Sequence, residues 1–258
     1  MTKPTIMKVV DSNVLQCVHL NEYLAQSPTN FAVLTDYAAV EAYKAETLDM
    51  LYRSMRILSQ FPKQVVILKS TPILCGLYGR RAGLQRRLID QRQTTRFAKF
   101  CAQLAEAQRG KRSVEIPLLD HARGARLEME RLLPDADEFR AGIEKLATEF
   151  TEHEKKILAG GHQPFTERMR VKIQGDVIAN AILMLRQHHR VSKMPKREEL
   201  PNTFIFRYFL CRYIYAITLL IPGRVQVKKS DKLRNELVDM VFVACATYFD
   251  EGSSRWFR

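Results

Sequence analysis

Acidic residues near the two ends of this chain are the side chains whose type and setting point to chemistry. Asp11 directly follows a short apolar run, Met7 to Val10, which predicts a buried strand that ends on a carboxylate. Ligands of open α/β sheets bind beyond the carboxyl ends of the strands, so Asp11 is expected in that crevice. Glu236 and Asp239 lie three residues apart in a predicted helix and therefore share one of its faces.

A third acidic candidate follows the second apolar run, Phe31 to Leu34. Asp36 is expected to cap the helix that starts there. Glu41 lies about one and a half turns inside that helix, among alanines small enough to let it approach the sheet closely. Carboxylate oxygens are the ligands that Mg²⁺ and Mn²⁺ prefer. Acids brought together from distant parts of a basic chain indicate a divalent-metal site beside a polyanion.

Each of these residues also has an ordinary structural interpretation. Asp11 is of a type that caps helices, and Glu41 or Glu236 could pair with a nearby lysine on a helix surface. Asp239 lies on an otherwise apolar helix, which is hard to explain as a solvated face. Asn13 either bonds the turn backbone or orients a carboxylate, and both interpretations remain open.

Three apolar runs predict the strands that position the acids: Ile6 to Val10, Phe31 to Leu34, and Val65 to Leu68. Between the second and third strands, Asp36 to Gln60 has helical spacing. This alternation predicts a parallel sheet with right-handed crossovers. From Thr71 onward the pattern is helical, and the predicted helices run over residues 84–109, 118–132, 135–159, 164–190, 201–221 and 233–249. The last of them is expected to return to the sheet.

The acidic segments together resemble the PIN-domain family of nucleases. Val9 to Leu15 looks like the opening of a PIN domain: a strand, Asp, a small polar residue, Asn, then an apolar helix. Asp36 to Lys44 is similar to the helix that supplies the second PIN carboxylate, and Asp239 to Ala246 looks like the third acidic segment. The resemblance covers roughly residues 5 to 70 and 228 to 250.

The resemblance implies an α/β fold, a three-layer α/β/α parallel sheet with a large all-helical insertion. Residues 1–70 and 228–258 would form the nuclease core, and residues 71–227 the insertion. It implies metal-dependent phosphodiester hydrolysis, favouring RNA over DNA, as in toxin–antitoxin or defence nucleases. Asp11, Glu41 and Asp239 would be the catalytic carboxylates that bind Mg²⁺ or Mn²⁺.

Two further acids, Glu236 and Asp250, are candidates for completing that site. The last PIN acid normally follows a short strand in a Thr/Ser-x-Asp context, and neither feature is clear from Tyr248 to Arg258. This departure keeps a second hypothesis open: a nucleic-acid- or protein-binding module on a degenerate PIN-like scaffold. A third is a helical component of a larger assembly, with the aromatic-rich stretch from Phe204 to Tyr215 as its interface.

The charge of the chain predicts an anionic partner. The 258 residues carry a net charge of +13, with a pI near 9.7. This favours nucleic acid or an acidic membrane surface, although a basic soluble protein is the plain alternative. Ten Arg or Lys residues lie between Tyr78 and Arg112, against two acids. The residues expected to contact phosphates are Arg80, Arg81, Arg86, Arg87, Lys228, Lys229, Lys232 and Arg234.

The remaining composition favours a cytoplasmic protein. Five cysteines are scattered without a C-x-x-C pair, which suggests neither a zinc site nor a disulfide framework. The N-terminus lacks the pattern of a signal peptide. Thr203 to Ile221 is apolar, but Arg207 and Arg212 interrupt it, so no membrane span is expected. The expected partners are RNA, an antitoxin or other protein, and another copy of the chain.

Overall fold

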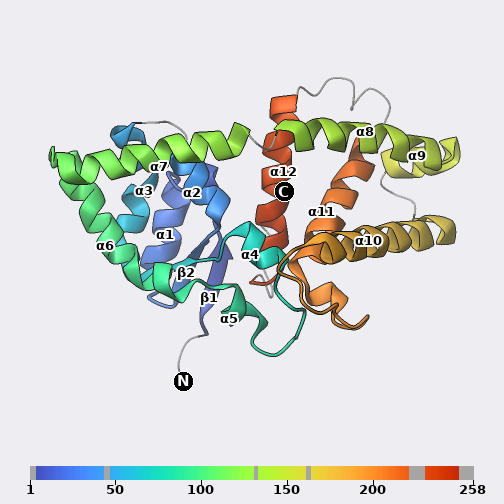
Figure 1. The fold of residues 1–258 in the computed structure, drawn as a ribbon, viewed down its shortest axis with the longest axis horizontal. Coiled ribbons are helices and arrows are strands. Elements are labelled where there is room, and N and C mark those ends of the chain that lie inside the picture. Colours follow the sequence, from blue (N-terminus) through green and yellow to red (C-terminus); the bar gives the residue numbers. More distant parts are fainter. Residues whose placement is uncertain (1–3, 44–46, 131–132, 161–163, 221–229, 250–258) are drawn as a thin grey trace. The chain divides into compact units, whose positions relative to one another are not determined.

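The computed structural model describes residues 4–43, 47–130, 133–160, 164–220 and 230–249. The chain divides into two compact units (Figure 1). Unit 1 consists of Met1–Thr71, Gly83–Arg131 and Cys245–Arg258, and unit 2 of Pro72–Ala82 and Leu132–Ala244. The described residues form many helices and one small parallel sheet, which makes the protein a member of the α/β class. No helix among the described residues is long and apolar enough to cross a membrane.

The sheet belongs to unit 1 and confirms the predicted strands. It consists of β1 (Ile6–Val9), β2 (Asn30–Leu34) and β3 (Val65–Ile67), in the order β1-β2-β3. Both pairings are parallel, with Val9 opposite Val33 and Val33 opposite Val66. Because the strands run in one direction, their carboxyl ends meet at the same edge of the sheet.

The helices of unit 1 follow the strands as the sequence predicts, but with more breaks. They are α1 (Val18–Gln26), α2 (Asp36–Tyr43), α3 (Leu48–Gln60), α5 (Leu84–Leu88), α6 (Gln91–Gln108) and α7 (Arg112–Glu130), with 3-10 turns η1 (Ser12–Val14) and η2 (Pro62–Gln64). The predicted helix from Asp36 to Gln60 is two helices. Thr47 ends the break by accepting a hydrogen bond from the Met50 amide, at 3.3 Å, and so capping α3.

A second break falls where one helix was predicted over residues 84–109. Ile89 forms an antiparallel bridge with Leu68, next to β3. Asp90 then accepts a hydrogen bond from the Gln93 amide, at 2.9 Å, and caps α6. The bridge satisfies backbone groups that a continuous helix would have used, so the tertiary pairing overrides the helical pattern.

Strand β2 is the centre of the unit 1 core. Ala32, Val33 and Leu34 are all buried. The turn before β2 is tied to β3 by Gln64, whose Nε2 donates to the backbone oxygens of Leu24, Ser27 and Asn30, at 3.0, 2.9 and 2.8 Å. One side chain thus satisfies three carbonyl groups of the connection that sets where β2 begins.

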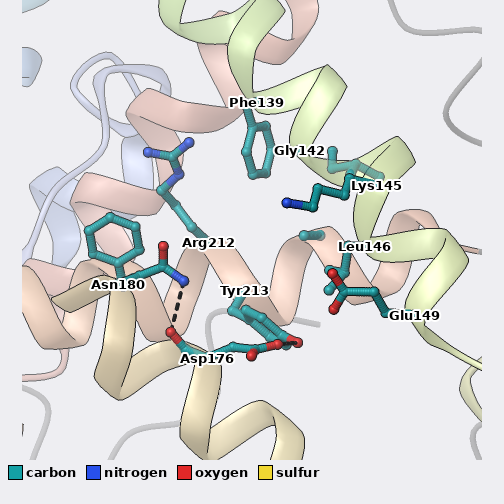
Figure 2. A pocket seen from close by; sticks show the side chains of 12 residues that line it. Phe139, Gly142, Lys145, Leu146, Glu149, Asp176, Asn180, Arg212 and Tyr213 are labelled. Atoms are coloured by element: carbon teal, nitrogen blue, oxygen red, sulfur yellow. Dashed lines mark hydrogen bonds between the residues drawn. The ribbon is translucent and has the colours of Figure 1, made fainter. Parts of the chain in front are cut away.

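In the residues that the structure describes, the regular secondary structure of unit 2 is helical. It contains α8 (Leu133–Glu149), α9 (Glu152–Gly160), α10 (Glu167–Gln187), η3 (Leu200–Asn202), α11 (Phe204–Leu219) and most of α12 (Ser230–Ala246); α4 (Thr71–Cys75) begins in unit 1 and ends in unit 2. The core of unit 2 joins α8, α11 and α12 through Ile143, Ala216 and Leu237. A pocket of about 320 Å³ lies between α8, α10 and α11 (Figure 2).

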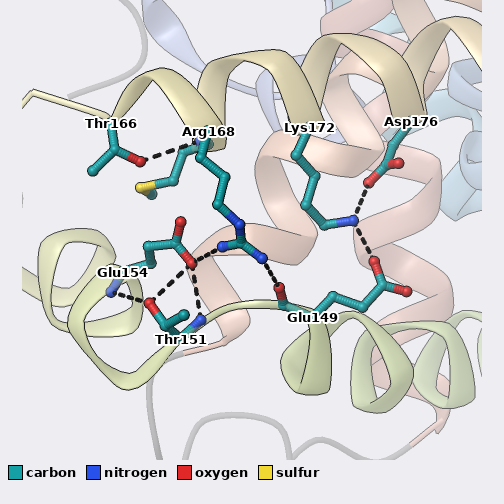
Figure 3. A network of polar contacts seen from close by, with 8 residues as sticks. Glu149, Thr151, Glu154, Thr166, Arg168, Lys172 and Asp176 are labelled. Carbon is teal, nitrogen blue, oxygen red and sulfur yellow. Dashed lines mark hydrogen bonds and ion pairs between the residues drawn. The ribbon is translucent and has the colours of Figure 1, made fainter.

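A polar network fastens α8, α9 and α10 together (Figure 3). Arg168 pairs with the buried carboxylate of Glu154 and donates to the Glu149 backbone oxygen at 3.0 Å. Lys172 pairs with the Glu149 carboxylate and, at 3.0 Å, with Asp176. The arginine joins α10 to both α8 and α9, and the lysine joins α10 to α8, so the network fixes the spacing of the three helices.

The two units do not follow the boundaries predicted for a core and an insertion. Residues 83–131 lie within the predicted insertion, yet they belong to unit 1, because α6 packs on β3 and α7 packs on α2. Residues 230–244 were predicted to belong with the strands, yet they belong to unit 2, because Leu233 and Leu237 are buried in its core. The predicted helix over residues 135–159 is also divided, into α8 and α9.

Candidate active site

Asp11 lies at the carboxyl end of β1, where the sequence places it. The Val10 amide still pairs with the Val33 oxygen at 3.0 Å, and the chain then leaves the sheet. The Asp11 side chain makes no capping bond to the backbone of the following turn. Its Oδ2 instead accepts from Asn13 Nδ2 at 3.0 Å, and its Oδ1 from the Ser12 hydroxyl at 3.3 Å. Two neighbours therefore orient a half-buried carboxylate that has no capping role.

Asp36 lies at the end of the adjacent strand, but it does not cap α2 as predicted. Thr35 is the cap, since its hydroxyl accepts from the Ala38 amide at 3.1 Å. The Asp36 carboxylate also reaches toward the end of β3, where it accepts from the Thr71 amide at 2.6 Å and from the Thr71 hydroxyl at 2.8 Å. Burial raises the pKa of Asp36, and the hydrogen bonds from Thr71 partly offset that rise.

Glu41 is half-buried on α2. This helix packs against η1, the turn that directly follows Asp11. Its other neighbours include α7, whose His121 ring lies 6.4 Å from the ring of Tyr43. The element that carries Glu41 therefore borders the turn that carries the orienting residues of Asp11, and both belong to unit 1.

Glu236 and Asp239 lie on α12, within unit 2. Glu236 is half-buried, whereas Asp239 is exposed. Burial, a hydrogen bond with Glu236 and the charge of Asp239 all raise the pKa of the Tyr215 hydroxyl on α11. Glu236 thus has a structural partner on the neighbouring helix. From the sequence alone, the expected structural partner of Glu236 was Lys232, one turn earlier in the same helix.

The acidic candidates are therefore distributed over both units. Asp11 and Glu41 belong to unit 1, and Glu236 and Asp239 to unit 2, while Asp250 lies outside the described residues. In the described parts of the chain, no group of three or more His, Cys, Asp or Glu side chains is arranged to hold a metal ion. Of the predicted site residues, Asp11 and Glu41 lie in the same compact unit.

The predicted phosphate-contacting residues are also divided. Arg80 and Arg81 are exposed in unit 2, Arg86 is exposed and Arg87 half-buried in unit 1, and Lys232 is exposed and Arg234 half-buried on α12. Lys228 and Lys229 lie outside the described residues.

A more regular basic surface lies on α6. Arg92, Arg96 and Lys99 are all exposed and are spaced four and three residues apart, which places them on one face of the helix. The opposite face buries Phe97 and Leu104. Helix α6 starts beside the carboxyl end of β3, since the Asp90 amide donates to the Ile67 oxygen at 2.8 Å. The basic face thus begins at the edge of the sheet that carries Asp11 and Asp36.

Two contributors to this edge gave only weak signals in the sequence. Ser12 and Thr71 both donate to a strand-end carboxylate. A small hydroxyl residue next to an Asp is common, and Thr71 lies 35 residues from its partner. Only the parallel pairing of β2 and β3 brings Thr71 to Asp36.

Comparisons with known proteins identify no relative. No protein-family model matches the chain, and neither the curated proteins nor the solved structures give a significant match.

Proposed function

We propose that the protein is a metal-dependent nuclease of PIN-like type, acting on RNA in preference to DNA. The observation that supports this most is the setting of Asp11. The carboxylate lies at the carboxyl end of a parallel strand, is oriented by Asn13 and Ser12, and does not cap the following turn. Carboxylates so held at this edge of a sheet are suited to bind a ligand rather than to stabilise a helix end.

The donor set fits a hard divalent cation. Each Asp11 oxygen accepts one described hydrogen bond, from Ser12 or Asn13, and a carboxylate has about four lone-pair sites. Oxygen ligands of this kind suit Mg²⁺ or Mn²⁺. A bound ion would activate the attacking water and stabilise the leaving oxygen. In this proposal Glu41 and Asp239 supply the other carboxylates. Glu236 is instead the hydrogen-bond partner of Tyr215.

Basic side chains would hold the nucleic-acid backbone near that edge. Contacts from Arg92, Arg96 and Lys99 to phosphates would be independent of sequence, since phosphates carry no base information. They would also weaken with added salt, because binding releases counterions. The exposed Arg80, Arg81 and Arg86 are further phosphate contacts in this proposal.

Cleavage of a fluorescent single-stranded RNA with Mn²⁺ tests the proposal. Asp11→Asn should abolish the activity, as should EDTA. Asp49→Asn is the matched control, because Asp49 is an exposed acid of unit 1 that pairs with Arg53 on its own helix. The control should keep the wild-type rate. Cleavage that persists in both Asp11→Asn and EDTA would rule out the proposed mechanism.

The second candidate is a non-catalytic module that binds nucleic acid or protein. The observation that favours it is the lack, among the described residues, of a group of three or more metal-binding side chains. Calorimetric titration with Mn²⁺ separates the two functions. Binding that disappears in both Asp11→Asn and Asp239→Asn supports the nuclease. RNA binding without Mn²⁺ binding supports the module.

A further inference from the structure

The pocket between α8, α10 and α11 has features of a ligand-binding site that are separate from the acidic edge of the sheet. Its volume of about 320 Å³ lies within the size range of small-molecule sites. Helix α8 contributes Phe139, Ile143 and Leu146 to an apolar wall, and α11 contributes Phe209 and Ala216. All of the lining residues belong to unit 2, so the pocket is complete within one compact body.

Two cationic side chains line this apolar wall. The Arg212 guanidinium lies 4.7 Å from the ring centre of Phe139 and 5.7 Å from that of Phe209. Lys145 is exposed on α8, and among the described residues no carboxylate lies within ion-pair distance of its amino group. In the view of Figure 2 the Phe139 ring is drawn between the arginine and the lysine.

The acids of the pocket are already engaged. Asp176 accepts from the Tyr213 hydroxyl at 2.6 Å and from Lys172 at 3.0 Å. Lys172 also pairs with Glu149 (Figure 3). Lys172 thus offsets one of the two negative charges, and the Tyr213 hydroxyl occupies an oxygen of Asp176, whereas Lys145 keeps its charge available. The pocket therefore combines an apolar wall, aromatic rings and an excess of positive charge.

We infer that this pocket binds a small amphipathic anion, a flat ring that carries one carboxylate or phosphate group. The ring would lie against the apolar wall of α8 and α11, with the anionic group at Lys145 and in the field of Arg212. Aromatic and apolar walls with a few charged groups are typical of such sites. The inference rests on unit 2 alone and does not depend on the nuclease proposal.

Calorimetry on the full chain with two pairs of probes tests this inference. Adenosine monophosphate is compared with adenosine, and 2-naphthoate with 2-naphthylmethanol, so each anion has an uncharged partner with the same ring. We expect at least one anion to bind, and its uncharged partner to bind at least about tenfold more weakly, as the loss of a charge-assisted contact predicts. Whether the phosphate probe or the carboxylate probe binds more tightly identifies the anionic group that the pocket prefers.

Two variants locate the site. Lys145→Gln removes the charge of an exposed residue and should weaken the anion about tenfold. Gly142 lines the pocket, and a Cβ there would meet nothing within 4 Å, so Gly142→Leu fills the space without disturbing the helix. Gly124→Leu is its control, because Gly124 is equally open on α7 in unit 1.

The expected result is lost binding in Gly142→Leu and unchanged binding in Gly124→Leu, with melting temperatures no lower than that of the wild type. The inference is overturned if neither anion binds, if anions and their uncharged partners bind alike, or if Gly142→Leu binds as the wild type does.

Discussion

Asn13 donates from its side-chain amide to Asp11 Oδ2 over 3.0 Å. The bond spans two residues of one turn and holds the carboxylate at the carboxyl end of β1. A metal-binding carboxylate usually needs such a partner, because the orientation of the ligand determines how well it meets the ion. The bond settles which of its two expected roles Asn13 has: it orients a carboxylate.

The first prediction concerns this orienting bond. Asn13→Ala should lower kcat/KM for Mn²⁺-dependent RNA cleavage by about tenfold to a hundredfold, as loss of a partner to a metal ligand typically does. The thermal unfolding midpoint should change little, because Asn13 is exposed. Gln26→Ala, at an exposed position of α1, is the control and should leave both quantities unchanged. Equal activity in the two variants would contradict the role assigned to Asn13.

The second prediction concerns the pH dependence of Asp36. Burial raises the pKa of Asp36, so its favourable contribution to folding falls as pH rises from 3.8 through the folded pKa. Thr71→Val removes the hydroxyl donor and should raise that pKa further. The variant should be less stable than the wild type by about 1–2 kcal/mol near pH 7, with a smaller difference below pH 3.8.

Urea denaturation at the two pH values measures that difference. Thr95→Val is the control, because the Thr95 hydroxyl donates to the Gln91 oxygen of its own helix and not, within the described residues, to a carboxylate. A difference between wild type and Thr71→Val that is the same at both pH values would show that the hydroxyl does not act through the Asp36 charge.

The third prediction concerns the buried acid of unit 2. The Glu154 side chain is 5% exposed, and the hydrogen bond from Arg168 is the largest cause that lowers its pKa. A lowered pKa stabilises the fold above pH 4.5, and that contribution is lost as pH falls toward the folded value. Glu154→Gln should cost about 1–3 kcal/mol near pH 7 and progressively less below pH 4.5.

Denaturation curves across this pH range test that prediction. Glu152→Gln is the matched control on the same helix, because the Glu152 side chain is 80% exposed and pairs with Lys155 at the surface. Its effect on the free energy of unfolding should be small, because exposed ion pairs are screened by solvent and contribute little. If the two variants were equally stable, the polar network around Arg168 would not contribute to the fold as described.

The fourth prediction concerns Gln64. Gln64→Ala leaves three backbone oxygens without their described side-chain donor, so it should destabilise the protein by about 1–3 kcal/mol. Gln60→Ala removes the same type of side chain from an exposed position at the end of α3 and should have little effect. Chemical denaturation measures both. A similar stability loss in both variants would indicate that removing a glutamine side chain, rather than losing these three hydrogen bonds, is responsible.

The fifth prediction concerns the basic face of α6. Replacing Arg92, Arg96 and Lys99 by Gln should weaken RNA binding and lower the slope of log K against log salt by about two, since each lost phosphate contact on a single strand contributes about 0.7. Replacing Lys193, Lys196 and Arg197 changes the net charge equally and should leave most of the slope intact. Fluorescence anisotropy at several salt concentrations measures RNA binding by both triple variants. An equal loss of affinity and slope in the two variants would indicate an effect of net charge alone.

The strands were predictable because their signal is local. Apolar runs such as Val65 to Leu68, bounded by polar and turn residues, are sufficient to locate a short buried strand, and Asp11 and Asp36 follow such runs directly. The breaks within the predicted helices were not predictable, because they depend on residues that are distant in the sequence. Ile89 leaves the helix only because Leu68 is there to pair with it.

The candidate site was predictable in its residue types and less so in its contacts. An Asp at a strand end indicates an edge of the sheet, but its hydrogen-bond partners come from the turn geometry. The exposure of Asp239 and the bond between Glu236 and Tyr215 depend on how α11 and α12 pack, and the apolar pattern of α12 does not encode that choice. The two compact units divide the chain differently from the predicted core and insertion, since α6 and α7 have helical patterns that fit either body.

The nuclease proposal depends most on Asp11, which should bind a divalent metal ion at the carboxyl end of β1. The most direct measurement is anomalous diffraction at the manganese edge from crystals soaked in MnCl₂. The nuclease proposal predicts a peak about 2 Å from a carboxylate oxygen of Asp11. A map with no peak at Asp11 would contradict the proposal.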